Sequence, residues 1–101
     1  MNKSLEITVN GVSYPCRMTM GAMLRFKRET GREITDVQMT SLSDVAILLW
    51  CCTASACNAD KIDFKLSLED FCDGISEEEM FSATTAFETD GGSSDQQKKS
   101  L

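Results

Sequence analysis

One stretch of this sequence is apolar on every side that a helix would present. Residues 45–57 carry only apolar or small side chains, and they follow Ser41-Leu42-Ser43-Asp44, a start typical of a capped helix. One stripe of the expected helix, over residues 42–58, holds Val45, Leu48, Leu49, Cys52 and Ala56, and the opposite stripe holds Ile47, Trp50, Cys51, Ala54 and Cys57. A surface helix has a single apolar stripe, so this one must be enclosed by its own fold, a partner or a bilayer.

The length of the apolar run bears on whether it crosses a membrane. The run has about 13 residues, whereas a bilayer requires roughly 20. Asp44 precedes it and Asn58 follows it, so interfacial anchors are missing. The N-terminus leads into an alternating pattern and contains no signal-peptide block. These features favour a soluble, cytoplasmic protein without a membrane segment.

The chain begins with a pattern typical of a β-hairpin. Residues 5–9 and 12–16 alternate between apolar and polar side chains, and Asn10-Gly11 between them suits a turn with positive φ. Pro15 has no amide hydrogen, so its strand must be an edge strand or be paired on one side only. Two strands are marginally stable alone, and the hairpin therefore needs a helix to pack against.

Helix signals occur both before and after the apolar run. Thr19 is a candidate N-cap and Gly31 a candidate C-terminal residue for a helix over 20–30. After a loop and the apolar helix, residues 60–66 alternate and predict either a short strand or an extended connector. Ser67 predicts the start of a short helix that ends at Gly74, and the Ser76–Glu79 segment has the pattern of a capping box.

Together these elements predict the fold class and the domain boundary. The chain has 101 residues, which is enough for one modest domain. We expect an α+β domain over residues 1–88, with an N-terminal hairpin packed on a bundle of about four helices around the central apolar helix. Residues 89–101 are polar and rich in glycine and serine, and they predict a disordered tail.

The residue types that most catalytic and metal sites require are scarce. Histidine is absent, so the commonest general base and zinc ligand is missing, and no glycine-rich phosphate loop occurs. Three of the five cysteines lie in the apolar helix and are interpreted as small buried hydrophobes. A thiol enzyme would use Cys16 or Cys72, for which we expect no lowered pKa. We therefore expect no enzymatic activity, no cofactor and no metal.

The net charge of −6 is unevenly distributed. Residues 17–33 carry five basic and two acidic side chains, whereas residues 60–90 carry ten acidic side chains and two lysines. This balance argues against nucleic-acid binding by the whole chain. The basic group of Arg25, Lys27, Arg28 and Arg32 is read as a solvated helix face or, alternatively, as a match for an acidic partner or for the acidic half of a second copy.

The order of elements resembles that of the tail assembly chaperones of long-tailed bacteriophages and gene transfer agents. In that family an N/D-G-x-x-Y hairpin, matched here by Asn10-Gly11 and Tyr14, leads to a first helix whose end is matched by Glu29-Thr30-Gly31. A later S/T-x-E-x-F/L helix start is matched by Ser67, Glu69 and Phe71. The likeness extends over residues 5–88.

The resemblance implies a non-enzymatic protein that coats the tape measure protein and recruits tail tube subunits in the host cytoplasm, and that in some cases forms homo-oligomers. The apolar and basic side chains expected to bind partners are Met20, Met23, Phe26, Arg25, Arg28, Ile47 and Trp50. The alternatives are a structural phage protein, such as a head–tail connector or tail component, and a small protein-binding adaptor. Whether Ile47, Trp50 and Ala54 lie in the core or at an interface is left open by the sequence.

Overall fold

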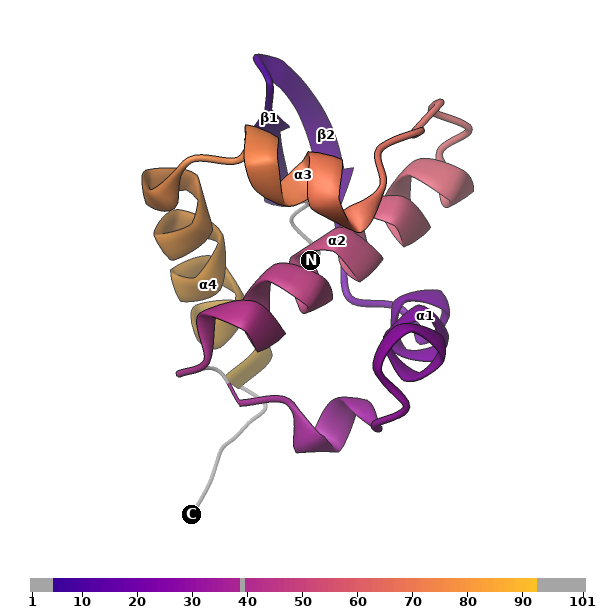
Figure 1. Cartoon of the computed structure of the whole chain (residues 1–101), viewed down its shortest axis with the longest axis vertical. Coiled ribbons are helices and arrows are strands. Elements are labelled where there is room, and N and C mark those ends of the chain that lie inside the picture. The colour runs from indigo at the N-terminus through magenta and orange to yellow at the C-terminus, as the bar shows by residue number, and fades with distance from the viewer. Residues whose placement is uncertain (1–4, 39, 93–101) are drawn as a thin grey trace.

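The fold is a two-stranded hairpin followed by four α-helices, as the sequence pattern predicts (Figure 1). The computed structural model describes residues 5–38 and 40–92, and the side chains of residues 87–92 are not among the described parts. The elements are β1 (Leu5–Val9), β2 (Val12–Cys16), α1 (Met20–Thr30), a 3₁₀ turn (Ile34–Asp36), α2 (Leu42–Ala59), α3 (Leu68–Gly74) and α4 (Glu77–Gly92). Helix α2 runs through the middle, with α1 on one side and α4 on the other (Figure 1).

The hairpin is closed by the expected turn. Asn10 and Gly11 both have positive φ, 54° and 80°, and Val9 pairs with Val12 on either side of them. Pro15 lies opposite Glu6 in a sheet of two strands, so no second neighbour needs its missing amide hydrogen. The turn is also held from outside, because the Asn10 backbone N–H donates to the Gly74 carbonyl at the end of α3 (3.0 Å).

Helix α2 is the core helix of the domain. Its predicted first stripe, Val45, Leu48, Leu49, Cys52 and Ala56, is buried throughout. On the opposite stripe Cys51 and Cys57 are also buried, whereas Ile47, Trp50 and Ala54 are half-buried. Helices α1, α3 and α4 and strand β2 all contact α2. Most of the apolar surface of α2 is therefore covered by other elements of the same chain.

By length and composition alone, α2 could cross a membrane. It has 18 residues with a mean hydropathy of 1.4, but 56% of them are buried inside the domain. Its first turn also carries Asp44, which is 8% exposed and paired with Arg32. This degree of burial by other elements is typical of a core helix.

Three local features differ from a simple reading of the sequence or settle an open alternative. Residues 62–67 form an extended connector without strand pairing. Helix α4 continues to Gly92, although we placed the start of the tail at residue 89, and residues 93–101 lie outside the described residues. Only half of the capping box forms: Ser76 Oγ accepts from the Glu79 backbone N–H (3.0 Å), but the Glu79 carboxylate accepts from the Thr8 backbone N–H (3.0 Å).

Candidate protein-binding groove

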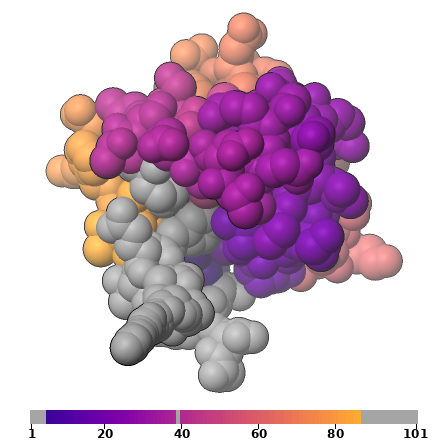
Figure 2. Space-filling view, turned by 90° about the horizontal axis from the view of Figure 1, so that it is seen from below, coloured from indigo at the N-terminus to yellow at the C-terminus, as the bar shows by residue number. Residues whose placement is uncertain are grey.

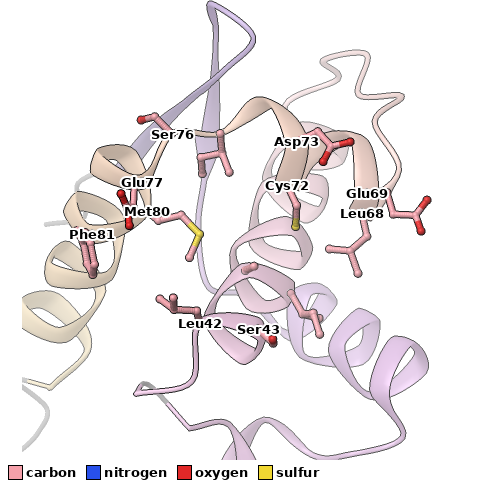
Figure 3. A pocket seen from close by; sticks show the side chains of 13 residues that line it. Leu42, Ser43, Leu68, Glu69, Cys72, Asp73, Ser76, Glu77, Met80 and Phe81 are labelled. Atoms are coloured by element: carbon pink, nitrogen blue, oxygen red, sulfur yellow. The ribbon is translucent and has the colours of Figure 1, made fainter.

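A groove opens where the start of α2 meets α3 and the start of α4 (Figure 3). Its volume is about 740 Å³, which lies within the range of roughly 300–1,000 Å³ typical of binding pockets. The lining side chains come from these three helices and from the link between α3 and α4: Leu42, Ser43, Ala46, Ile47, Leu68, Glu69, Cys72, Asp73, Ile75, Ser76, Glu77, Met80 and Phe81. We refer to this site as the groove.

The groove exists because α3 and α4 are separate helices. Ser67 Oγ caps α3 by accepting from the Asp70 backbone N–H (3.1 Å), and α3 ends after only seven residues. The chain then turns through extended Ile75 and starts α4 at a second serine cap, Ser76. The two helices diverge from this junction, and Leu42 and Ser43 at the start of α2 stay exposed in the space between them (Figure 3).

The groove leaves large apolar side chains open to solvent. Leu42 is 60% exposed and Phe81 57% exposed, and they come from α2 and α4 respectively. Met80 extends from α4 toward Leu42 across the opening (Figure 3). Single exposed apolar residues are ordinary, but several around one concavity mark an interaction surface.

Every charged side chain in the lining is acidic. Glu69 and Asp73 come from α3 and Glu77 from the first turn of α4, and none of the described lining residues is basic. The carboxylates lie at the edge of the groove, around the apolar side chains (Figure 3). The arrangement suits an amphipathic helix with apolar side chains on one face and lysine or arginine beside them.

One thiol belongs to the groove, and the others are enclosed. All five cysteines lie in the described part of the chain, and Cys72 alone is exposed. Desolvation, with Asp73 adding to it, raises the pKa of the Cys72 thiol. Burial raises the pKa of Cys51 to about 11. Neither thiol is therefore activated as a nucleophile.

Cys16 corrects one expectation. Its pKa is lowered, chiefly because the Cys52 thiol hydrogen-bonds to it, whereas we expected no lowered value from the sequence. Cys16 is nevertheless only 1% exposed, between β2 and α2, where a substrate has no access. Within residues 5–38 and 40–92, no three cysteine or carboxylate side chains gather as a metal site would require.

The predicted partner-binding residues fall into different places. Ile47 lines the groove, and Trp50 is half-buried with its indole N–H donating to the Leu66 carbonyl (3.1 Å). Met20 is 68% exposed at the start of α1, and Arg28 is exposed two turns further along the same helix. These residues therefore occupy two separate surfaces and one packed position.

Phe26 does not belong to a surface, and its prediction was wrong. It is fully buried, and the Arg32 guanidinium lies 5.5 Å from its ring centre. The helical turn of α1 places Phe26 with Ala22 on the face that packs inside the domain. Met23 and Arg25 are half-buried at the borders of that face, and Arg25 donates to the Gly21 carbonyl (3.3 Å).

The basic group of the sequence is also divided. Arg32 pairs with Asp44 at 2.7 Å, and Lys27 pairs with Glu33 at 2.8 Å. Arg32 therefore holds the loop to α2 and is not part of a solvated helix face. Arg28 has no ion pair within the described residues.

Sequence reasoning missed most of the groove. Leu42, Leu68, Met80 and Phe81 were each placed on a helix, but nothing local indicates that they converge. Leu42 lies directly after the Ser41 cap of α2, and no pattern in the sequence indicates that its side chain stays exposed. No protein-family model, curated protein or solved structure matched the chain.

Proposed function

We propose that this protein is a phage tail assembly chaperone that holds an amphipathic helical segment of the tape measure protein in the groove and recruits tail tube subunits. The observation that carries the proposal is the groove itself, an apolar concavity whose charged lining is entirely acidic. Part of the resemblance supports it, because some of its motif residues occupy turns and caps of this fold. Asn10-Gly11 form the hairpin turn, Gly31 ends α1 and Ser67 caps α3.

The groove suits transient holding of a client. Full burial of an apolar side chain contributes roughly 1.5–3 kcal/mol of binding free energy, so burial of two or three client side chains would supply useful affinity. The carboxylates of Glu69, Asp73 and Glu77 lie at the rim, where charges favour association rate and orientation over tight binding. A chaperone must release its client when the tail tube forms, and binding of this kind is readily reversed.

Under this proposal the protein acts in the host cytoplasm, without a cofactor, nucleic acid or membrane. The groove offers no activated thiol and no cluster of metal ligands among its described residues. The protein would have no further role once the tail is complete. The proposal therefore expects the protein to be missing from purified particles, as measured by mass spectrometry, whereas a connector or other tail component would be retained.

The direct test is co-expression with the neighbouring tape measure and tail tube genes, followed by affinity capture at low salt. Wild-type protein should retain the tape measure protein. Leu42→Glu, which places a like charge among the rim carboxylates at a side chain 60% exposed, should lose it.

Val12→Glu is the matched control, because it adds the same charge at a side chain 50% exposed on the hairpin, outside the groove lining. If Leu42→Glu and Val12→Glu capture the tape measure protein equally well, the groove is not the client-binding site. Absence of any complex with the wild-type protein would refute the proposed function.

A further inference from the structure

Three sulfur atoms come together where the end of β2 meets the middle of α2. The Cys52 thiol hydrogen-bonds to Cys16, and its Sγ lies 3.9 Å from the Sδ of Met18. Cys16 is 1% exposed and Cys52 is fully buried, whereas Met18 is 42% exposed. Two enclosed thiols therefore lie beside one thioether at the surface. We refer to Cys16, Met18 and Cys52 as the sulfur cluster.

The backbone that carries Met18 is fixed against α2. Met18 lies in the link between β2 and α1, and both of its neighbours in the chain bind to α2. The Arg17 backbone N–H donates to the Cys52 carbonyl (3.4 Å), and a hydrogen bond of 2.6 Å joins Thr19 Oγ1 to Ser55 Oγ. The fold itself therefore keeps the thioether within reach of the two thiols.

The distance between the sulfurs suits a metal ion with three sulfur ligands. A first-row metal–thiolate bond is about 2.3 Å long, so the ligands of a trigonal site lie about 4 Å apart. The separation of 3.9 Å between Cys52 Sγ and Met18 Sδ agrees with this value, and Cys16 lies within hydrogen-bonding distance of Cys52. Little rearrangement is needed to place the sulfurs around one ion.

The ligand types select a soft monovalent ion. Thiolate and thioether sulfurs favour Cu(I), whereas a zinc site takes four ligands from cysteine, histidine and carboxylate side chains. The chain has no histidine, and no three cysteine or carboxylate side chains gather within residues 5–38 and 40–92. The absence of these ligands underlies our expectation of no metal, and it does not bear on a site built from two thiolates and a thioether.

We propose that the sulfur cluster binds one Cu(I) ion, held by the thiolates of Cys16 and Cys52 and by the thioether of Met18. Binding releases the two thiol protons to solvent, and copper stays in the +1 state, so no electron is transferred. Met18 is the exposed ligand and is the first that an arriving ion meets. The bound ion joins the end of the hairpin to the core helix.

The sulfur cluster is separate from the groove. None of its three residues lines the groove, whose walls come from α3 and from the starts of α2 and α4. Met18 leads into α1, and Figure 2, seen from below, shows the violet residues of the α1 region on the right and the orange residues of α4 on the left. Cu(I) binding would leave the groove open, so it is independent of client binding and goes beyond the proposed function.

The test is the transfer of Cu(I) from its coloured bicinchoninate complex to the full chain, without oxygen. The starting protein is Cys72→Ser, because Cys72 is the exposed thiol among the five and would bind Cu(I) outside the cluster. This protein should withdraw one Cu(I) per chain, and X-ray absorption at the copper edge should show three sulfur neighbours. The bound ion should also raise the midpoint of thermal unfolding, since it binds only the folded arrangement.

Met18→Leu in this background distinguishes a ligand from a packing residue. The change conserves size and apolar character at a partly exposed position, so the variant should fold, which circular dichroism checks. Loss of a supporting partner alone typically lowers metal affinity by about 10–100-fold, so loss of a ligand should weaken Cu(I) binding by at least about tenfold. Cys16→Ala and Cys52→Ala should abolish transfer.

Cys51→Ala is the matched control, because Cys51 is equally buried on the same helix and lies outside the sulfur cluster. It should bind Cu(I) as the starting protein does. The inference is overturned if the starting protein takes up no Cu(I), if copper has only two sulfur neighbours, or if Met18→Leu binds with unchanged affinity. A loss in Cys51→Ala as large as in Cys16→Ala would also overturn it. Capture of the tape measure protein is measured separately and tests only the groove.

Discussion

Arg32 holds Asp44 by two hydrogen bonds, from Nη2 to Oδ1 at 2.7 Å and from Nη1 to Oδ2 at 3.1 Å. Asp44 Oδ2 also accepts from the Gln38 backbone N–H at 3.0 Å. The carboxylate lies in the first turn of α2, where the helix dipole favours negative charge. This single side chain therefore fixes both ends of the loop that joins α1 to α2, beside one wall of the groove.

Replacing Asp44 with Asn should lower stability in a pH-dependent way. The hydrogen bonds from Arg32, and next that from Gln38, hold the pKa of the Asp44 carboxyl below its usual value. A lowered folded-state pKa stabilises the fold fully above the unfolded pKa of about 4, and this contribution is lost as the pH falls through the folded value. Urea unfolding should therefore show Asp44→Asn less stable than wild type at pH 7, with the difference shrinking below about pH 4.

Asp63→Asn is the control for that series. Asp63 is 78% exposed, and its contact to the similarly exposed Lys65 spans 3.6 Å. Such a surface ion pair contributes little, so Asp63→Asn should change the free energy of unfolding little at any pH. An Asp44→Asn difference that stays constant down to pH 2 would contradict the role assigned to the Arg32 pair.

Substitutions at Gly21 and Ser55 should have strongly non-additive effects on the free energy of unfolding. A Cβ added at Gly21 would lie 2.9 Å from Ser55 Oγ, which is hydrogen-bonded to the Oγ1 of Thr19, the N-cap of α1, at 2.6 Å. Alanine favours a helix over glycine by up to about 1 kcal/mol. We expect Gly21→Ala to destabilise the wild-type protein by roughly 1 kcal/mol, because displacing the buried hydroxyl outweighs that gain.

In a Ser55→Ala background the nearest obstacle is gone, and the remaining close atom, Arg25 Nη1 at 3.1 Å, ends a long side chain that can move, so Gly21→Ala should become neutral or stabilising. A four-variant cycle of denaturation curves measures this interaction energy directly. Additive effects would show that the α1–α2 approach is looser than the distances indicate.

Cys72 should be the one thiol that reacts in the native protein. The other four cysteines are buried, so a disulfide reagent should modify one thiol quickly and the rest only on unfolding. The raised pKa of Cys72 should make this reaction slower near neutral pH than that of free cysteine. Cys72→Ser should abolish the native reaction, whereas fast modification of a second site would show that the core opens.

Loss of the Glu79 side chain should lower stability more than loss of its neighbour Glu78. The Glu79 carboxylate accepts from the Thr8 backbone N–H on β1, at 3.0 Å, and so ties the hairpin to α4. Glu79→Ala should cost about 0.5–1.5 kcal/mol by loss of this bond. Glu78→Ala, an exposed change in the same helical turn, should stay within about 0.5 kcal/mol. Equal losses in thermal unfolding would instead indicate a shared effect of charge at the start of α4.

The hairpin and the helix starts were predictable because their causes are local. Asn10 and Gly11 tolerate positive φ, and Ser41 and Ser67 each cap the helix that begins after them. The capping box shows the limit of such reasoning. Ser76 behaves as its pattern predicts, but Glu79 bonds to Thr8, 71 positions earlier in the chain, and no local pattern specifies that partner.

The sequence by itself determined that α2 is enclosed on all sides, because apolar side chains around a whole helix cannot face water. The structure showed that the chain's own elements enclose most of it. Only the tertiary structure decided which apolar side chains stay outside. Phe26 and Met20 belong to the same helix, yet one is fully buried and the other 68% exposed. Burial of a residue depends on which neighbours reach it after packing, and that is a property of contacts between distant segments. The groove has the same origin, since Leu42, Leu68 and Phe81 meet only once three helices are in place.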